Sequence, residues 1–399
     1  MDVRSVEKMD NFRKLWLYVT FYKTGDWIRI IAIPLAIYNK TGSAFYMASA
    51  YGVSFLPWML SIFGGLVSDR FPRRNILKIS SLLSSIMMTA IALLIISDEF
   101  NIHLLMVLLF FLSLIEPFSH PAEQSIIPLI VEKKSLFSAN SSIQLVNNTL
   151  STIGPVLGGA IIAFLGVKNS LFISCFLYLL SFIPIFKMNL SESIDLTKKI
   201  NILTDIKDGL RITYKTKFVL YGSFLFFFTN FAIHLFQANL VFFIVDFLGY
   251  STLEVSIVLS ISGIGAIFGA FFARHLNEKS RSPNIIISSS TFLAGITTYL
   301  MYYASNYIII GIILGITYFL GSINVVTYFS SRQKLVPQEF LGRVVSVTRL
   351  ISFLSIPIGS VLGGWLITNS SYSIGLIIVL SATVRTFAGV FSFLFLKFK

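Results

Sequence analysis

The chain has 399 residues, of which 55% are hydrophobic and 12% are charged, and its formal net charge is +13. Its mean hydropathy of +0.81 and its charged fraction, well below the roughly 25% of ordinary globular domains, exclude a soluble globular protein. Lysine and arginine fall mostly between long apolar runs, so the positive charge indicates an anionic membrane surface rather than nucleic acid. With one cysteine and no clustered set of metal ligands, no metal site or cofactor is expected.

Apolar runs long enough to cross a membrane as helices follow one another along the whole chain. They predict an all-α integral membrane protein with twelve transmembrane helices and one long polar connection, residues 189–216. That connection carries apolar residues at helical spacing between 201 and 214, which predicts a short amphipathic helix on the inner membrane face. The expected spans are residues 14–38, 43–67, 74–96, 102–128, 137–165, 168–188, 217–246, 251–273, 284–303, 307–330, 341–367 and 373–396.

Lysine and arginine are distributed unequally between alternate loops. Twenty-five of the 31 fall in the termini and the even-numbered loops, and only Lys40 and Lys168 fall in the other loops. The positive-inside rule therefore places both termini and residues 189–216 in the cytoplasm. The sequence predicts a multi-pass protein of a bacterial cytoplasmic membrane, in contact with membrane lipid.

Two parts of the chain repeat each other at an offset of 205 residues. Residues 62–65 (Ile-Phe-Gly-Gly) match 267–270 (Ile-Phe-Gly-Ala), and residues 156–159 (Val-Leu-Gly-Gly) match 361–364. Parallel repeats of this kind are typical of transporters whose binding site lies between the halves. The expected domains are an N-terminal six-helix bundle over 1–188, a cytoplasmic linker over 189–216 and a C-terminal six-helix bundle over 217–399.

The most highly charged turn, residues 64–74, joins the second and third spans. Its sequence resembles the loop motif Gly-x-x-x-Asp-Arg-x-Gly-Arg-Arg of the major facilitator superfamily, with Pro72 in place of a glycine. The matching residues are Gly65, Asp69, Arg70, Arg73 and Arg74. Together with the two six-span halves, the resemblance covers nearly the whole chain, and it implies the major facilitator fold of two six-helix bundles.

Smaller motifs narrow the resemblance. Gly154 and Pro155, followed by a glycine pair, resemble the proline-glycine motif of the superfamily's antiporters. Other patches, including Gly25-Asp26, are similar to the drug:proton antiporter branch that contains macrolide-efflux and enterobactin-export proteins. The resemblance implies a secondary active transporter, not an enzyme, that exports an amphipathic or hydrophobic small molecule such as a drug in exchange for protons. An importer, a lipid or siderophore exporter and a non-transporting receptor are alternatives, and a monomer is expected.

The charged turn is a candidate for conformational gating. Its glycines permit close approach of another helix, which by the resemblance is the eleventh span. Asp69 would then lie at the positive end of that helix and stabilise a state closed to the cytoplasm. Arg274 occupies the equivalent position in the second half, so a single asymmetric latch is expected; alternatively the loop only sets topology. The gating candidates are Gly64, Gly65, Asp69, Arg70, Arg73, Arg74, Gly154 and Pro155.

Charges within the spans are costly and are therefore candidates for proton coupling. Asp26 lies about 18 Å into the first span, and Lys23 and Arg29 lie three residues to either side of it, on nearly the same helix face. Two interpretations of Asp26 therefore stay open: a structural cluster whose charges neutralise one another, or a proton carrier. Glu116 has no charged residue within four positions, and a buried carboxyl without a partner suits reversible proton binding. His120 lies one turn further and is grouped with Glu116 and Asp26 as a proton-coupling candidate.

Cations and aromatic rings within the spans supply candidates for a substrate cavity. The cations suit an anionic substrate whereas Asp26 and Glu116 suit a cationic one, so the charge of the substrate is left open. The rings are candidates for an apolar pocket, with packing in the core or against lipid as the alternative. The cavity candidates are Lys23, Arg29, Trp58, Phe227, Phe231, His234 and Arg349.

Two other charges within the spans are expected to have structural roles. Glu123 is expected nearer the cytoplasmic surface, paired with a loop arginine. Arg385 lies in a span that the resemblance makes peripheral, so it is expected to support helix association or to extend toward the membrane surface.

Overall fold

The computed structural model describes residues 3–132, 135–190, 192, 202–279, 282–337, 340–369 and 373–396. Within these ranges the regular structure is entirely helical, which confirms the predicted all-α class. The chain divides into two compact units, Met1–Thr41 with Leu60–Ile200, and Gly42–Met59 with Asn201–Lys399. The expected domain boundaries stay a prediction, and the compact units differ from them because residues 42–59 group with the second unit.

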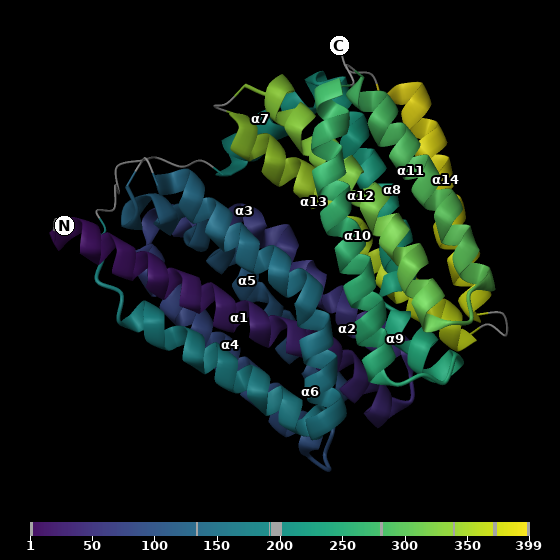
Figure 1. The fold of residues 1–399 in the computed structure, drawn as a ribbon, viewed down its shortest axis with the longest axis horizontal. Helices are drawn as coiled ribbons and strands as arrows, with labels where there is room; N and C mark the ends of the chain where they lie inside the picture. Colours follow the sequence, from purple (N-terminus) through teal and green to yellow (C-terminus); the bar gives the residue numbers. More distant parts are fainter. Residues whose placement is uncertain are drawn as a thin grey trace. The chain divides into compact units, whose positions relative to one another are not determined.

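The first unit is built around the long helix α1. This helix packs along α6, while α4 packs against both α5 and α6, and α3 packs against α5. Figure 1 shows α1, α4 and α5 running next to one another. The helices are α1 (Val3–Thr41), α3 (Ser61–Arg70), α4 (Arg73–Ile96), α5 (Ile102–Ile130) and α6 (Leu136–Phe186).

The turn between the fifth and sixth expected spans is a single glycine within α6. Gly166 has φ of 78° and ψ of 164°, a conformation that interrupts the helix, and glycine adopts positive φ without the steric cost of a Cβ. The interruption falls between residues 165 and 168, where the sequence predicted one span to end and the next to begin.

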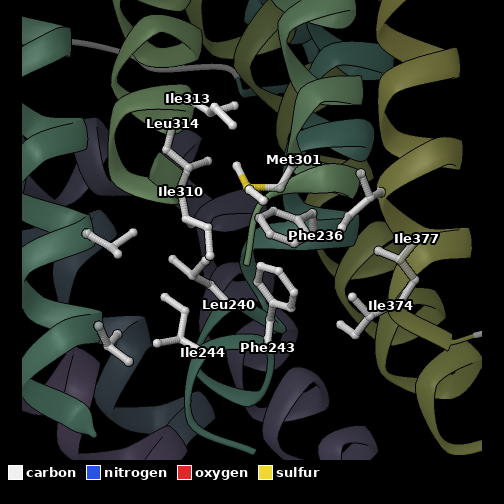
Figure 2. Packing of buried hydrophobic residues seen from close by; sticks show 14 of the residues in the cluster. Phe236, Leu240, Phe243, Ile244, Met301, Ile310, Ile313, Leu314, Ile374 and Ile377 are labelled. Atoms are coloured by element: carbon white, nitrogen blue, oxygen red, sulfur yellow. The ribbon is translucent and has the colours of Figure 1, made fainter. Parts of the chain in front are cut away.

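The second unit packs α10 against α12, α8 against α13 and α11 against α14. Figure 2 shows an apolar cluster of this unit, in which Phe236, Phe243 and Met301 meet Ile310 and other aliphatic side chains. The elements are α2 (Ala44–Phe55), α7 (Ile202–Lys215), α8 (Lys217–Gln237), α9 (Leu240–Phe242), η3 (Phe243–Phe247), α10 (Thr252–Lys279), α11 (Pro283–Tyr299), η4 (Leu300–Tyr303), α12 (Tyr307–Leu335), α13 (Leu341–Asn369) and α14 (Ser373–Phe395).

The second expected span is broken rather than continuous. Between α2 and α3 the chain forms the 3₁₀ turn η1 (Leu56–Leu60), which contains the buried Pro57. In the second unit α2 packs against α13, and a Cβ added at Gly52 would lie 3.3 Å from Cα of Pro357. In the first unit α3 packs against α5, so η1 links an element of one unit to an element of the other.

Nine helical segments in the described part of the chain are long and apolar enough to cross a membrane. Helix α1 is not among them because it carries Lys23, Asp26 and Arg29 in its interior. The break at η1 leaves α2 and α3 too short, and Ile153–Phe186 counts as one segment although Gly166 interrupts it. The fold is that of an all-helical membrane protein, and the count of twelve spans stays a prediction.

The predicted amphipathic helix is present as α7. It packs on the second unit, where Arg343 Nη1 donates to Asp208 Oδ2 at 2.9 Å and an added Cβ at Gly209 would come 2.8 Å from the Arg343 carbonyl oxygen. Leu210 and Tyr214 are 50% and 66% exposed. This exposed apolar side is the one available to lipid, and its position on the membrane face stays a prediction.

Candidate functional site

A cluster of charged side chains occupies the interior of the first unit. Lys23 Nζ donates to Glu116 Oε1 at 2.8 Å and lies 3.7 Å from Asp26 Oδ2. Arg29 Nη2 donates to the other Asp26 oxygen at 3.0 Å. The cluster therefore joins α1 to α5 through alternating charges, two cations and two carboxylates, in a region where isolated charges are costly.

Tyr178 of α6 completes this cluster. Its hydroxyl donates to Asp26 Oδ1 at 2.7 Å and accepts from Arg29 Nε at 3.1 Å. The sequence analysis missed Tyr178, although a signal was present. The buried polar residues Ser170, Ser174, Tyr178 and Ser181 recur at helical spacing in an apolar helix, and such a stripe indicates a face that packs against other polar groups.

The expectation that Glu116 lacks a partner is wrong. No charged residue lies within four positions of Glu116 along α5, whereas its partner, Lys23, is 93 residues away in sequence. Both side chains keep some exposure, 22% for Lys23 and 29% for Glu116. Glu116 is thus a paired carboxylate that is not fully enclosed by the described protein, and its role in proton coupling stays a proposal.

The carboxyl group without a partner is Glu123. It lies two turns after Glu116 on α5 and is 9% exposed, and within the described part of the chain it forms no hydrogen bond or ion pair. The expected pairing with a loop arginine is therefore not seen: Arg73 contacts Ser125 and Glu192 instead. With Glu123 included, three carboxyl groups face two cations in this interior.

His120 lies between these two acids in sequence. Its Nε2 is 3.5 Å from Nε2 of Gln124, one turn further along α5. Its grouping with Glu116 and Asp26 as a proton-coupling candidate stays a prediction.

The basic loop is anchored within the first unit. Glu192 accepts from the backbone N–H groups of Arg73 and Arg74 at 2.8 and 2.9 Å. The Arg74 guanidinium donates to the carbonyl oxygens of Ile185 and Phe186, while Arg70 is exposed. The loop thus closes one end of the unit by joining the start of α4 to the end of α6.

The two glycines of the loop motif differ in their surroundings. A Cβ added at Gly64 would overlap the Pro117 carbonyl oxygen of α5, whereas one added at Gly65 would meet no described atom within 4 Å. The close approach at Gly64 is therefore to α5, and the expected contact of this glycine pair with the eleventh span stays a prediction. The side chains of Asp69 and Arg274 lie outside the described part of the structure, so the asymmetric latch stays a prediction.

The glycine-proline motif of α6 packs against α1. A Cβ added at Gly154 would come 2.5 Å from the Trp27 ring, and one added at Gly158 would lie 3.2 Å from the Trp27 carbonyl oxygen. Pro155 is buried in the same contact region. The motif therefore permits the close approach of two helices that hold the charge cluster, and its gating role stays a prediction.

The second unit brings three of the other candidates onto neighbouring elements. His234 Nδ1 of α8 lies 3.2 Å from the Tyr51 hydroxyl of α2, and its ring contacts that of Phe55. Trp58 contacts Phe353 of α13 edge-on at 5.9 Å. Arg349 lies over the Trp58 ring, with 5.7 Å from Cζ to the centroid, a cation–π arrangement.

The two remaining aromatic candidates lie on α8 itself. Phe227 contacts the exposed ring of Phe228 at 5.5 Å. Phe231 is half-buried and packs against the apolar cluster of Figure 2. Phe231 therefore packs partly in the core, and core packing is one of the alternatives to a substrate pocket that the sequence left open.

An apolar groove of about 820 Å³ runs along α3, α4 and α5 in the first unit. Phe71, Ile79, Val107 and Phe111 line it and are each at least half exposed. Apolar surface of this kind is compatible with hydrocarbon, and the expected contact with membrane lipid stays a prediction.

Comparison with known proteins gives a family. The model of a family described as transmembrane secretion effectors matches residues 7–399. The chain is 25% identical to the MFS-type transporter YfiS of Bacillus subtilis, over 87% of this chain and 85% of that protein. It is 24% identical to the multidrug efflux pump Tap of Mycolicibacterium fortuitum, over 85% of each. Macrolide efflux protein A of Streptococcus pyogenes is 22% identical over 83% of each.

Solved transporter structures share the fold. A point mutant of the nucleoside transporter NupG superposes with a TM-score of 0.81, at 10% identity, over 98% of this chain and 100% of that chain. A D-xylose-proton symporter superposes with a TM-score of 0.69, at 14% identity, over 98% of each. At these identities the likeness concerns the fold alone.

Proposed function

Because the chain belongs to the major facilitator superfamily, in the family described as transmembrane secretion effectors, we propose that it exports an amphipathic or hydrophobic small molecule, such as a drug, in exchange for protons. Transport proceeds by alternating access across a bacterial plasma membrane, and both termini lie in the cytoplasm. The relatives named as a multidrug efflux pump and a macrolide efflux protein support export and this class of substrate.

The observation that carries the proton coupling is the charge cluster of the first unit. Lys23 lies 2.8 Å from Glu116 and 3.7 Å from Asp26. When Glu116 binds a proton it no longer attracts Lys23, and Asp26 becomes the nearer negative charge. Protonation therefore shifts Lys23 between two carboxylates on different helices, which gives a local change that a transport cycle can use.

Glu123 supplies a second proton-binding group on the same helix face. It lies seven residues, or two turns, from Glu116 and is buried without a described partner. A carboxyl group in such surroundings can take up and release a proton without breaking an ion pair. We assign Glu123 and Glu116 as successive positions of a proton along α5.

The aromatic surface of the second unit supports the proposed substrate class. This surface is built from α2, which carries Tyr51 and Phe55, from η1, which carries Trp58, and from α8, which carries His234. The rings of Tyr51, Phe55 and His234 contact one another, and Arg349 lies over the Trp58 ring. Planar rings bind apolar and aromatic ligands without a fixed pattern of hydrogen bonds, and such binding is compatible with several compounds. The guanidinium of Arg349 in this surface is also compatible with an acidic group on the substrate.

The test uses purified protein in liposomes with an acidic interior and a pH-sensitive dye inside. Macrolides and a panel of amphipathic dyes are added outside. We expect at least one compound to dissipate the pH gradient in a protein-dependent manner. Glu116→Gln and Glu123→Gln should each abolish this dissipation, whereas Glu99→Gln, which changes an exposed carboxyl group, should leave it intact.

Two results would contradict the proposal. If folded wild-type protein dissipates the gradient with none of the compounds, drug:proton antiport is wrong. If both Glu116→Gln and Glu123→Gln transport and dissipate the gradient as wild type does, the assignment of the proton to α5 is wrong while antiport stands. Size-exclusion profiles confirm that each variant is folded.

A further inference from the structure

Arg385 is a buried cation in the interior of the second unit. It lies on α14 and is 5% exposed, which favours the first of its two expected roles, support of helix association, over extension toward the membrane surface. Its guanidinium reaches α12, where a Cβ added at Gly321 would lie 3.5 Å from Nη2. That distance is an ordinary van der Waals contact, so the guanidinium lies directly against α12.

No carboxylate in the described part of the second unit pairs with Arg385. Asp208 pairs with Arg343, Glu254 accepts from Ser251 at the start of α10, and Asp246 is exposed at the end of η3. An arginine does not release its proton in proteins. The charge is therefore fixed, and burial without a counter-charge is strongly unfavourable.

The guanidinium borders a small cavity of about 20 Å³. Its apolar lining includes Phe236, Leu240 and Leu314, which Figure 2 labels. Its polar lining comes from Arg385, Thr317, Tyr318, Thr298, Gln237 and Ser381. Two donors at this cavity, Arg385 Nε and Thr317 Oγ1, are buried and have no hydrogen-bond partner among the described residues. The cavity thus combines a fixed positive charge with unused hydrogen-bond donors.

The size and charge of the cavity define its ligand. A volume of about 10–15 Å³ on this measure holds one water molecule, so the cavity accepts one water or one slightly larger ion but excludes a drug-sized molecule. Water would satisfy the donors but leave the charge of Arg385 uncompensated. We propose that the second unit binds one small inorganic anion, chloride in the cell, between Arg385 of α14 and Thr317 of α12.

A thermal-unfolding experiment tests the anion site on the purified full chain in detergent. Chloride replaces gluconate, which is too large for the cavity, at constant ionic strength and pH. Because a ligand that binds only the folded state stabilises it, we expect the Tm of the wild type to rise with chloride and to saturate. Bromide, which is close in size, should act in the same way.

Variants locate the effect. Arg385→Gln should abolish the chloride dependence, and Thr317→Val should raise the half-saturating chloride concentration roughly threefold to tenfold, the effect of one lost hydrogen bond. Thr297→Val makes the same change on α11, where the hydroxyl donates to the Leu293 carbonyl oxygen. Arg211→Gln removes an exposed arginine of α7. Both of these controls should keep the wild-type response.

The outcomes separate the anion site from a water-filled cavity. Equal Tm values in chloride and gluconate, or an unchanged chloride response in Thr317→Val, would overturn the proposal. If Arg385→Gln does not fold, anomalous scattering from bromide-soaked wild-type crystals replaces it. A peak beside Arg385 supports the site, and its absence overturns it. None of these measurements depends on transport.

Discussion

Lys23 holds two carboxylates of different helices within reach of one ammonium group. Its closest partner is Glu116 on α5, and Asp26 on its own helix is the second. Arg29 and Tyr178 continue to satisfy Asp26 when Lys23 is removed. Glu116 has no such substitute among its described contacts, so the energetic consequence of losing Lys23 falls mainly on Glu116.

This asymmetry predicts the result of a double-mutant cycle. Lys23→Met should lower the free energy of unfolding by about 1–3 kcal/mol, because it leaves the Glu116 carboxylate without its partner in a largely buried site. Glu116→Gln should also destabilise the protein. The double variant should be more stable than Lys23→Met alone, since no uncompensated charge remains. Tm measurements in detergent give the order of stability of the wild type, the two single variants and the double variant.

The control for this cycle lies on the same helix. Lys14 pairs with Asp10, which is 57% exposed, and an exposed pair contributes little to stability. Lys14→Met should therefore leave Tm almost unchanged. If Lys14→Met and Lys23→Met have equal effects, or if the double variant is the least stable protein, the pairing of Lys23 with Glu116 does not stabilise the fold.

Residue spacing predicted only the local part of the site. Lys23 and Arg29 are three positions from Asp26, and helical geometry alone brings them together. The bond from Lys23 to Glu116 spans 93 positions and depends on how α1 packs against α5, which the pattern of apolar residues does not specify. Which of the two expected roles Arg385 has could not be predicted for the same reason, because it depends on how the helices of the second unit pack around α14.

At the scale of elements, the approach of α3 to α5 depends on one glycine and one proline. Pro121 has no N–H, so it cannot donate to the Pro117 carbonyl oxygen one turn earlier in the helix. Gly64 packs against this same oxygen. A side chain at position 64 would overlap backbone atoms, which cannot move aside as a flexible side chain can.

We therefore expect Gly64→Ala and Gly65→Ala to differ although they are adjacent. Gly64→Ala should lower Tm, with a destabilisation of about 1–3 kcal/mol typical of overpacking. Gly65→Ala adds its methyl group where no described atom lies within 4 Å and should leave Tm near the wild-type value. Thermal unfolding in detergent gives the comparison. Equal Tm values for the two variants would contradict the close contact at Gly64.

The positions of helix breaks were predicted unequally well. The break at Gly166, which has positive φ, was predicted, because the apolar runs on either side were expected to end at 165 and to begin at 168. The break at η1 was missed, because Pro57 in an apolar run is also compatible with a continuous kinked helix. What separates α2 from α3 is a difference in partners, α13 for one and α5 for the other, and partners are set by tertiary structure.

At the scale of the whole molecule, orientation in the membrane decides whether the proposed transport is export. Within the first unit, Arg74 donates to the carbonyl oxygens of Ile185 and Phe186, so the basic loop and Lys187 lie at the same end. Lys40 donates to the Ser97 carbonyl oxygen near Glu99. The unequal distribution of lysine and arginine assigns the Arg74 end to the cytoplasm and the Lys40 end to the outside.

Cysteine labelling tests this orientation directly. The buried Cys175 is first replaced by serine, and single cysteines are then placed at two exposed positions, Glu99 and Lys187. In intact cells a membrane-impermeant maleimide should label Glu99→Cys but not Lys187→Cys, and permeabilised cells should give labelling at both. The reverse pattern would place the basic loop outside. The proton gradient of a living cell would then act on the opposite ends of the charge cluster, and the proposed direction of transport would be wrong.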